Sequence, residues 1–233
     1  MYVDVAEVAP VEMLPGFWRQ TLAWGDELML VLFRMRKDAE LTAHHHVHEQ
    51  VGYVIEGNVE LTVAGVRRPT PVGCCYFVDS DRLHQADVLA DALVIDAFSP
   101  PRLDYLPGAA QDFGAGTDGG VYDDGGRSAT LLAARARPLT VAPGAERRPL
   151  LGGRLVTMSL LTLEAGARVP SPPAAHERAG YVVSGTVRAE LADGERRCDS
   201  GSSFLARRGA PAGLVAEEAA MLVLAEAGSE ARP

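Results

Sequence analysis

Residues 48–59 read HEQVGYVIEGNV and residues 176–187 read HERAGYVVSGTV, so the two stretches overlie when the chain is shifted by 128 positions. The same shift carries the apolar run 91–98 onto the run 219–226. The residues that recur in the quoted stretches include His48, Glu49, Gly52, Tyr53 and Gly57. Self-similarity at one offset over so much of the sequence indicates two copies of one module.

Each copy consists mainly of short apolar runs bounded by Gly, Pro, Asp or Asn, a pattern typical of β-strands. Gly57 and Asn58 stand between two such runs and predict a two-residue hairpin. Residues 130–137 are the one modest candidate for a helix. Many short antiparallel strands in a repeated unit of about 100 residues predict an all-β fold with two tandem jelly-roll barrels.

The predicted division follows from this repeat and from a change in composition between its copies. Residues 107–127 are rich in Gly and Asp, as linkers are. We therefore expect a first domain at 1–107, a linker with a short helix at 108–139, and a second domain at 140–233.

Charge and composition exclude several classes of partner. The net charge of −9 over 233 residues disfavours nucleic acid or an anionic membrane as a partner. The acidic start MYVDVAEVAP does not resemble a signal peptide, and no apolar run approaches the roughly 18 residues that span a bilayer. The three cysteines include an adjacent pair, which is poor material for a disulfide framework. A cytoplasmic protein is expected.

Four of the six histidines lie at 44–46 and 48. Alternation along a strand puts His44 and His46 on one face, with Gln50 at the same parity, and His84 can face them from a neighbouring strand. These side chains are neutral donors that suit one divalent metal ion, which would keep most of its charge as a Lewis acid. The alternative is a polar loop with unconnected histidines.

The second copy separates ligands from structural residues. His176 and Glu177 repeat His48 and Glu49, whereas the four candidate ligands are replaced together. The replacing residues are Pro172, Ala174, Arg178 and Ala212. The pattern predicts that His48 is structural and that the second barrel binds no metal in this way.

A second group of candidates follows the last histidine. Asp96 and Phe98 share a parity near the end of a strand, and the turn at 99–102 can bring Arg102 over the cavity. A carboxylate there suits a general acid or base, and a guanidinium suits a carboxylate or phosphate of the substrate. The alternative is a structural ion pair between Asp96 and Arg102.

These motifs resemble the cupin superfamily. Residues 38–57 are similar to its first motif, with Asp38 in the glycine place and Gln50 in the glutamate place, and residues 71–84 are similar to the second. Residues 15–107 resemble the pectin-degradation cupins of the KdgF type, which convert 4,5-unsaturated uronates to open-chain keto sugars. The resemblance implies a bicupin with metal ligands His44, His46, Gln50 and His84 and catalytic residues Asp96, Phe98 and Arg102.

A fused second barrel without ligands is unusual for that branch and leaves the substrate open. The first hypothesis is redox-neutral proton transfer (ketonisation, isomerisation or cyclisation) on a small enolisable acid or polyketone. Cyclases and isomerases of antibiotic or polyketide biosynthesis belong to the same class. An iron-dependent dioxygenase and a non-catalytic small-molecule sensor are the alternatives. The candidate ligands do not identify the metal, which can be zinc, iron, nickel, manganese or cobalt. The sequence also allows a homodimer.

Overall fold

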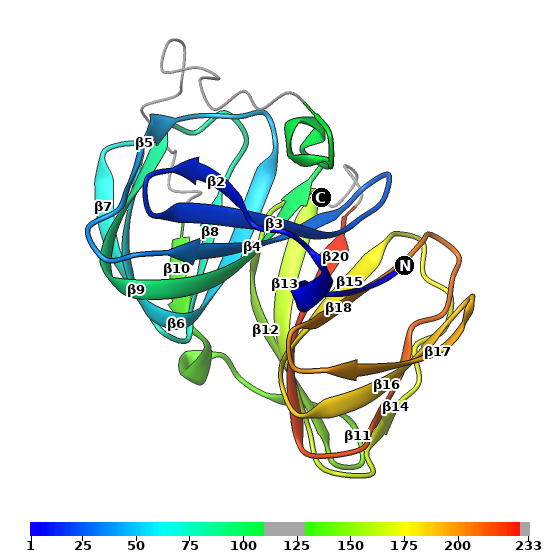
Figure 1. Cartoon of the computed structure of the whole chain (residues 1–233). Coiled ribbons are helices and arrows are strands. Elements are labelled where there is room, and N and C mark those ends of the chain that lie inside the picture. Colours follow the sequence, from blue (N-terminus) through cyan, green and yellow to red (C-terminus); the bar gives the residue numbers. More distant parts are fainter. Residues whose placement is uncertain (110–128, 229–233) are drawn as a thin grey trace.

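The computed structural model describes residues 1–109 and 129–228, and its strands form two β-barrels that lie side by side (Figure 1). The predicted all-β fold with two tandem barrels is confirmed. The described helices are single 3-10 turns, and none is long and apolar enough to cross a membrane. Most of the predicted linker, residues 110–128, lies outside the described residues.

The amino-terminal barrel is one antiparallel sheet with the order β10-β8-β6-β9-β4-β3-β2, to which β5 and β7 add along β9 and β6. Its elements are β2 (Val11–Leu14), β3 (Phe17–Trp24), β4 (Met29–Met35), β5 (Glu40–His44), β6 (Glu49–Val63), β7 (Val66–Pro71), β8 (Cys74–Val78), β9 (His84–Ser99), β10 (Ala129–Leu132) and the 3-10 turn η2 (Leu103–Tyr105).

The carboxy-terminal barrel consists of two sheets with the orders β1-β18-β15-β20-β13-β12-β11 and β14-β19-β16-β17. Its elements are β1 (Tyr2–Asp4), the 3-10 turn η1 (Val5–Glu7), β11 (Leu139–Ala142), β12 (Ala145–Gly152), β13 (Val156–Leu163), β14 (Arg168–Val169), β15 (Arg178–Ser184), β16 (Thr186–Leu191), β17 (Gly194–Asp199), β18 (Ser202–Ala206), β19 (Gly213–Ala216) and β20 (Ala220–Ala227).

The hairpin predicted at Gly57 and Asn58 is wrong. β6 continues through both residues, and its register against β9 shifts on either side of Gly57. Gly57 has a φ of +83°, and a Cβ there would lie 2.0 Å from the carbonyl oxygen of Asp91. The glycine therefore lets the strand bulge and bend where it passes close to its neighbour, and the chain does not reverse.

The two barrels exchange their first strands. β1 pairs with β18 of the second barrel, and β10, its equivalent at the 128-residue shift, pairs with β8 of the first. The predicted domain limits are therefore wrong for residues 2–4 and 129–132. The helix predicted at 130–137 is also wrong, because β10 and the 3-10 turn η3 (Ala133–Arg135) occupy this segment. The open edge of β8 supplies ladder hydrogen bonds that outweigh a weak helical pattern.

A buried glutamate from each barrel binds the backbone of the other. Glu49 accepts hydrogen bonds from the N–H groups of residues 154–156, at 3.0, 2.8 and 3.3 Å. Glu177 accepts three from residues 26–28, at 3.0, 2.9 and 3.1 Å. Both residues are only 1% exposed. The recurrence of this glutamate in the sequence thus reflects a reciprocal contact between the barrels.

Two equivalent glycines make room for these carboxylates. A Cβ at Gly25 would lie 2.0 Å from Oε2 of Glu177, and a Cβ at Gly153 would lie 2.3 Å from Oε2 of Glu49. Any larger side chain at Gly25 or Gly153 would collide with the buried carboxylate of the other barrel, which explains the glycine at both positions.

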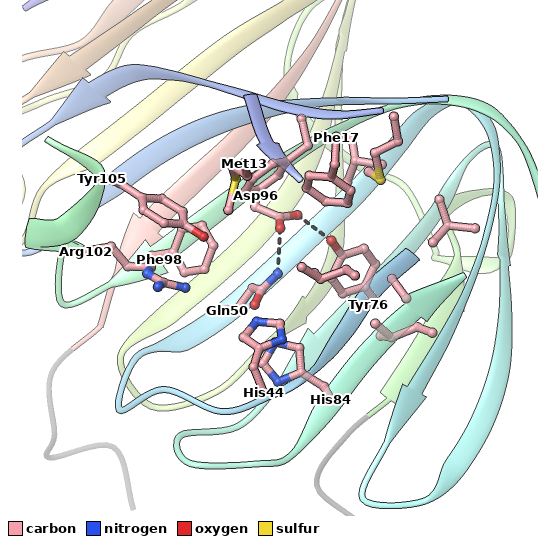
Figure 2. Close-up of a pocket in the computed structure, with 17 residues that line it drawn as sticks. Met13, Phe17, His44, Gln50, Tyr76, His84, Asp96, Phe98, Arg102 and Tyr105 are labelled. Atoms are coloured by element: carbon pink, nitrogen blue, oxygen red, sulfur yellow. Dashed lines mark hydrogen bonds between the residues drawn. The ribbon is translucent and has the colours of Figure 1, made fainter. Parts of the chain in front are cut away.

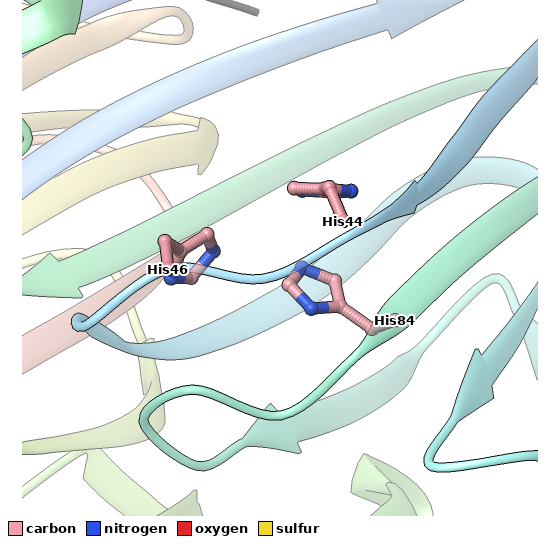
Figure 3. Close-up of side chains that lie close together, drawn as sticks. All are labelled: His44, His46 and His84. Atoms are coloured by element: carbon pink, nitrogen blue, oxygen red, sulfur yellow. The ribbon is translucent and has the colours of Figure 1, made fainter. Parts of the chain in front are cut away.

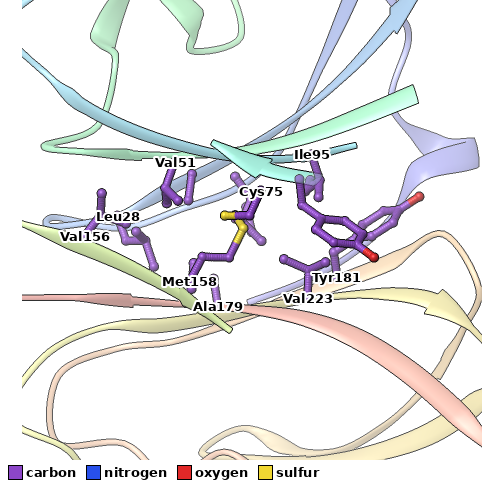
Figure 4. Packing of buried hydrophobic residues seen from close by; sticks show 14 of the residues in the cluster. Leu28, Val51, Cys75, Ile95, Val156, Met158, Ala179, Tyr181 and Val223 are labelled. Atoms are coloured by element: carbon purple, nitrogen blue, oxygen red, sulfur yellow. The ribbon is translucent and has the colours of Figure 1, made fainter. Parts of the chain in front are cut away.

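One apolar core joins the two barrels (Figure 4). Its buried members come from facing sheets of both halves, so neither barrel leaves this sheet face open to water. Tyr53 and its repeat Tyr181 both belong to it. The labelled members are Leu28, Val51, Cys75 and Ile95 from the first barrel and Val156, Met158, Ala179, Tyr181 and Val223 from the second.

We expect Glu49→Ala and Glu177→Ala each to lower the free energy of unfolding by about 3 kcal/mol or more, because each leaves three backbone N–H groups without their acceptor. Urea denaturation of both variants and of Glu218→Ala, which alters an exposed glutamate, measures the difference. Losses no larger than that of the control would show that these carboxylates do not hold the barrels together.

Candidate metal centre

Three histidines meet inside the amino-terminal barrel (Figure 3). His44 ends β5 and is the register partner of His84 at the start of β9, while His46 follows β5 in the connection to β6. A potential ligand atom of each histidine lies within 4.8 Å of the other two. The prediction that His44, His46 and His84 come together is thus realised in the structure.

Hydrogen bonds fix which nitrogen each ring presents. The Nδ1 atoms of His44, His46 and His84 lie 2.9, 3.1 and 2.7 Å from backbone carbonyl oxygens. A carbonyl accepts only from a protonated nitrogen, so these rings carry their proton on Nδ1 when they are neutral. Each Nε2 then keeps a lone pair that can bind a metal ion.

Burial keeps the imidazoles neutral. Loss of solvent lowers the pKa of His44, and it lowers the pKa values of His46 and His84 well below their ordinary value. The neighbouring histidines and Arg102 lower them further. Neutral imidazole is the form that binds a metal, so the site needs little deprotonation at neutral pH.

Gln50 completes the group from the start of β6. Its Nε2 donates to Oδ2 of Asp96 at 2.6 Å, which turns its Oε1 toward Nε2 of His46 at 3.1 Å. A neutral imidazole lone pair and an amide oxygen then face each other, and both are electron-pair donors. A cation is the partner that satisfies both, so the residues present fit a divalent ion.

Asp96 lies beside this group and is 1% exposed (Figure 2). Its Oδ1 accepts a hydrogen bond from the Tyr76 hydroxyl at 2.6 Å, and its Oδ2 accepts the one from Gln50. Burial raises the pKa of Asp96 to about 7, although both hydrogen bonds oppose the rise. The carboxyl group is therefore poised to hold or release a proton near neutrality.

Tyr76 is a site residue that the sequence reasoning missed. The position of Tyr76 on β8 is occupied by Phe204 in the second barrel, so the hydroxyl occurs only in the half that keeps the histidines. Gly52 leaves room for the contact between Tyr76 and Asp96, because a Cβ there would lie 2.2 Å from both Oδ1 of Asp96 and the Tyr76 ring. The replacement of Tyr76 by Phe204 in the second copy was the sequence difference that could have indicated a role for this hydroxyl.

Arg102 also faces the cavity, but the alternative of an ion pair with Asp96 is wrong. Its Nε and Nη2 donate to the two carboxylate oxygens of Asp104, at 3.2 and 2.7 Å. The guanidinium lies 4.0 Å from the ring centroid of Tyr105 and 5.8 Å from that of Phe98. Among the described residues, Nη1 has no hydrogen-bond acceptor. The neighbouring Asp104 carboxylate outcompetes Asp96 for this cation.

The cavity joins these polar groups to a largely apolar wall (Figure 2). The polar lining comes from His44, Gln50, Tyr76, His84, Asp96 and Arg102. The remaining lining residues are Met13, Phe17, Phe33, Met35, Leu41, Val59, Leu61, Ala86, Val94, Phe98 and Tyr105. Few water molecules can share such a space with a substrate.

Comparisons with known proteins agree with this geometry. Residues 31–96 match the Cupin domain model. The pectin degradation protein KdgF of Dickeya dadantii is 34% identical over 97 residues, which are 41% of this chain and 88% of that protein. This chain is a bicupin whose amino-terminal barrel belongs to the KdgF family.

Solved structures show the same double-barrel fold over the bicupin's whole length. The oxalate decarboxylase of Bacillus subtilis aligns with a TM-score of 0.77 at 14% identity, over 98% of this chain and 76% of that one. AerE of Microcystis aeruginosa aligns with a TM-score of 0.73 at 15% identity, over 97% and 98%. One study of the oxalate decarboxylase describes its Mn(II) centres. The three histidines of this bicupin form a group that can hold a divalent metal ion.

The second barrel of the bicupin offers no equivalent group. In the described part of the chain, the one cluster of three or more His, Cys, Asp or Glu side chains suited to a metal is the one at His44. Pro172, Ala174, Arg178 and Ala212 occupy the places of the four candidate ligands. None of them supplies an imidazole, thiolate or carboxylate.

Metal content tests the ligand assignment. We expect His46→Ala to lose the bound ion, since the ring faces both the other histidines and Gln50, and His48→Ala to retain it, since the His48 side chain lies outside the cluster. Elemental analysis after dialysis against manganese or zinc measures the ratio of metal to protein. Full loading of His46→Ala, or loss from His48→Ala alone, would contradict the assignment.

The pKa of Asp96 gives the metal-free protein a pH dependence of stability. Between about pH 4 and about pH 7 the folded protein keeps on Asp96 a proton that the unfolded chain has lost, so the contribution of Asp96 to the free energy of unfolding falls as pH rises. The buried histidines, whose pKa values are lowered, contribute the opposite slope in wild type and variant alike. Asp96→Asn removes the contribution of Asp96. We expect the free energy of unfolding of the variant to increase by a few kcal/mol relative to that of wild type as the pH rises from about 4 to 8.

Urea titrations across this pH range, with Asp193→Asn as the matched change of an exposed aspartate, measure the gain. Parallel curves for wild type and Asp96→Asn would mean that Asp96 has an ordinary pKa.

Proposed function

We propose that the bicupin is a metal-dependent enzyme that moves protons next to a carbonyl group of a small, carboxylate-bearing substrate, without net oxidation. His44, His46, His84 and Gln50 hold the ion in this proposal, and Asp96 is the proton carrier. The observation that carries the proposal is the position of the Asp96 carboxyl, which is buried in the same cavity as the histidines and accepts hydrogen bonds from Gln50 and Tyr76.

Asp96 suits both directions of a proton transfer. A pKa near the working pH lets one group take a proton from carbon or oxygen and return it at a neighbouring atom. Tyr76 and Gln50 hold its two oxygens at 2.6 Å each, so the carboxyl plane is fixed relative to the cavity. When bound, the ion would polarise a substrate oxygen and stabilise the negative charge that develops there.

Arg102 supports the assignment of an anionic substrate. Asp104 and the aromatic rings hold its guanidinium in place, while Nη1, which has no acceptor among residues 1–109 and 129–228, is left for one that enters the cavity. A fixed guanidinium binds a carboxylate with directional, charge-assisted hydrogen bonds. Phe98 lies between Arg102 and the His46 ring and so limits the room between the anion and the histidines.

The KdgF relationship supports 4,5-unsaturated uronates as the first substrates to test. The bicupin spans 88% of KdgF with its amino-terminal half, and Asp96, Phe98 and Arg102 lie within that half. Uronates carry the carboxylate that Arg102 suits, and their ketonisation is a redox-neutral proton transfer. Isomerisation and cyclisation of other enolisable acids would use the same groups.

Turnover under nitrogen separates these reactions from those of a dioxygenase. We expect the metal-loaded bicupin to consume a 4,5-unsaturated uronate equally well with and without oxygen. The loss of absorbance of the conjugated unsaturated acid measures this consumption. Asp96→Asn should lower kcat by about 10²- to 10⁴-fold, and Arg102→Gln should mainly raise KM, by about tenfold or more. Asp193→Asn, on an exposed hairpin, is the control for both.

Each contrary result has its own meaning. A strict need for oxygen would replace the proposal with oxidative chemistry. Full activity of Asp96→Asn would remove Asp96 from proton transfer. Failure on uronates by a fully metal-loaded protein would direct the search to isomerases and cyclases of other enolisable acids.

A further inference from the structure

The second barrel contains a cavity of its own, larger than that of the first. Its volume is about 220 Å³, compared with about 40 Å³ for the cavity beside the histidines. His84, which lines the first cavity, is replaced at the equivalent position by the smaller Ala212. Ala212 itself lines the cavity.

Arg178 stands in this cavity where the first barrel has Gln50. Its guanidinium donates to the Ser171 hydroxyl and to the carbonyl oxygens of Pro172 and Ala210, the latter two at 2.8 and 3.1 Å. All three acceptors are neutral, and within residues 1–109 and 129–228 Arg178 forms no ion pair. Its buried Nε has no acceptor among the same residues. Neutral acceptors hold the cation in place, and the nearby Glu226 carboxylate, which acts on it electrostatically, forms its ion pair with Arg147.

Arg147 and Glu226 line the same cavity and nearly cancel each other. The Nη2 of Arg147 lies 3.2 Å from Oε2 of Glu226, and its Nε donates to Ser159 at 2.8 Å. The charged lining therefore comprises two guanidinium groups and one carboxylate, which leaves one positive charge at Arg178. A single bound anion would balance this charge.

The rest of the cavity is apolar and reaches the surface. Leu161, Phe204 and Leu214 are buried along it, while Val141 and Pro170 are exposed at its edge. A ligand that enters past the exposed residues would thus meet a cation and an apolar wall together. This combination is typical of sites that orient an apolar molecule by one polar group.

We propose that the second barrel binds a small organic monocarboxylate, whose anionic group pairs with Arg178 and whose apolar part packs against Leu161, Phe204 and Leu214. In this proposal the barrel that lacks the three clustered histidines is an organic-anion site. The inference is independent of the reaction carried out in the first barrel.

Calorimetric titration of the metal-loaded full chain with hexanoate tests the inference, and hexanamide is the uncharged probe of the same shape. We expect saturable binding of hexanoate, and binding of hexanamide weaker by about tenfold or more. Arg178→Gln introduces the residue type that the first barrel has at Gln50, and it should weaken the binding of hexanoate by a similar factor. Ala212→Leu, which fills the cavity and keeps the charge, should weaken both probes.

Arg102→Gln removes the carboxylate-binding guanidinium of the first barrel, so the hexanoate binding that persists in this variant is the binding assigned to Arg178. Comparison of the two probes on wild type needs no variant to fold. Absence of saturable hexanoate binding up to about 10 mM, equal binding of hexanamide, or unchanged affinity in Arg178→Gln would each overturn the proposal. Loss of binding in Arg102→Gln instead would place the anion in the first barrel and overturn it too.

Discussion

Two carboxylates buried between the barrels are the contacts on which the rest of this structure depends. Glu49 and Glu177, both almost fully buried, each bind three consecutive backbone N–H groups of the other barrel. Charge-assisted hydrogen bonds of this kind are directional and costly to leave unmade. They set how the two sheets face each other across the shared core.

This contact also reaches the metal centre. Glu49 immediately precedes Gln50, so the attachment of Glu49 to the second barrel fixes the start of β6, from which Gln50 extends to Asp96 and His46. The backbone carbonyl of His48, the residue before Glu49, accepts a hydrogen bond from Nδ1–H of His46. The second barrel thus helps to orient Gln50 and His46, two of the proposed metal ligands.

The duplicated backbone carries two different interiors. In one copy His, Gln, Tyr and Asp side chains form a connected polar group, and Gly52 leaves space for its tyrosine and carboxylate. In the other copy the positions of Gln50 and Asp96 hold Arg178 and Leu224. The fold therefore survives complete replacement of the site, because the glutamate contacts, the shared core and the strand ladders lie elsewhere.

Much of this organisation was predictable from the sequence, because a repeat at a fixed offset reports both the fold and the positions that differ. Comparison of His44, His46, Gln50 and His84 with their replacements identified the site that the structure brings together. Strand exchange was not predictable, since β1 and β10 pair with edges far away in sequence. The hydroxyl of Tyr76 and the pairing of Arg102 with Asp104 depend on three-dimensional neighbours in the same way.

The central claim is that one divalent ion is bound by neutral donors of the first barrel alone. Anomalous diffraction from crystals grown with manganese tests it most directly. We expect one anomalous peak per chain, enclosed by His44, His46, His84 and the amide oxygen of Gln50, with none in the second barrel. A peak at another place, or no peak among the three imidazoles of a metal-replete protein, would contradict it.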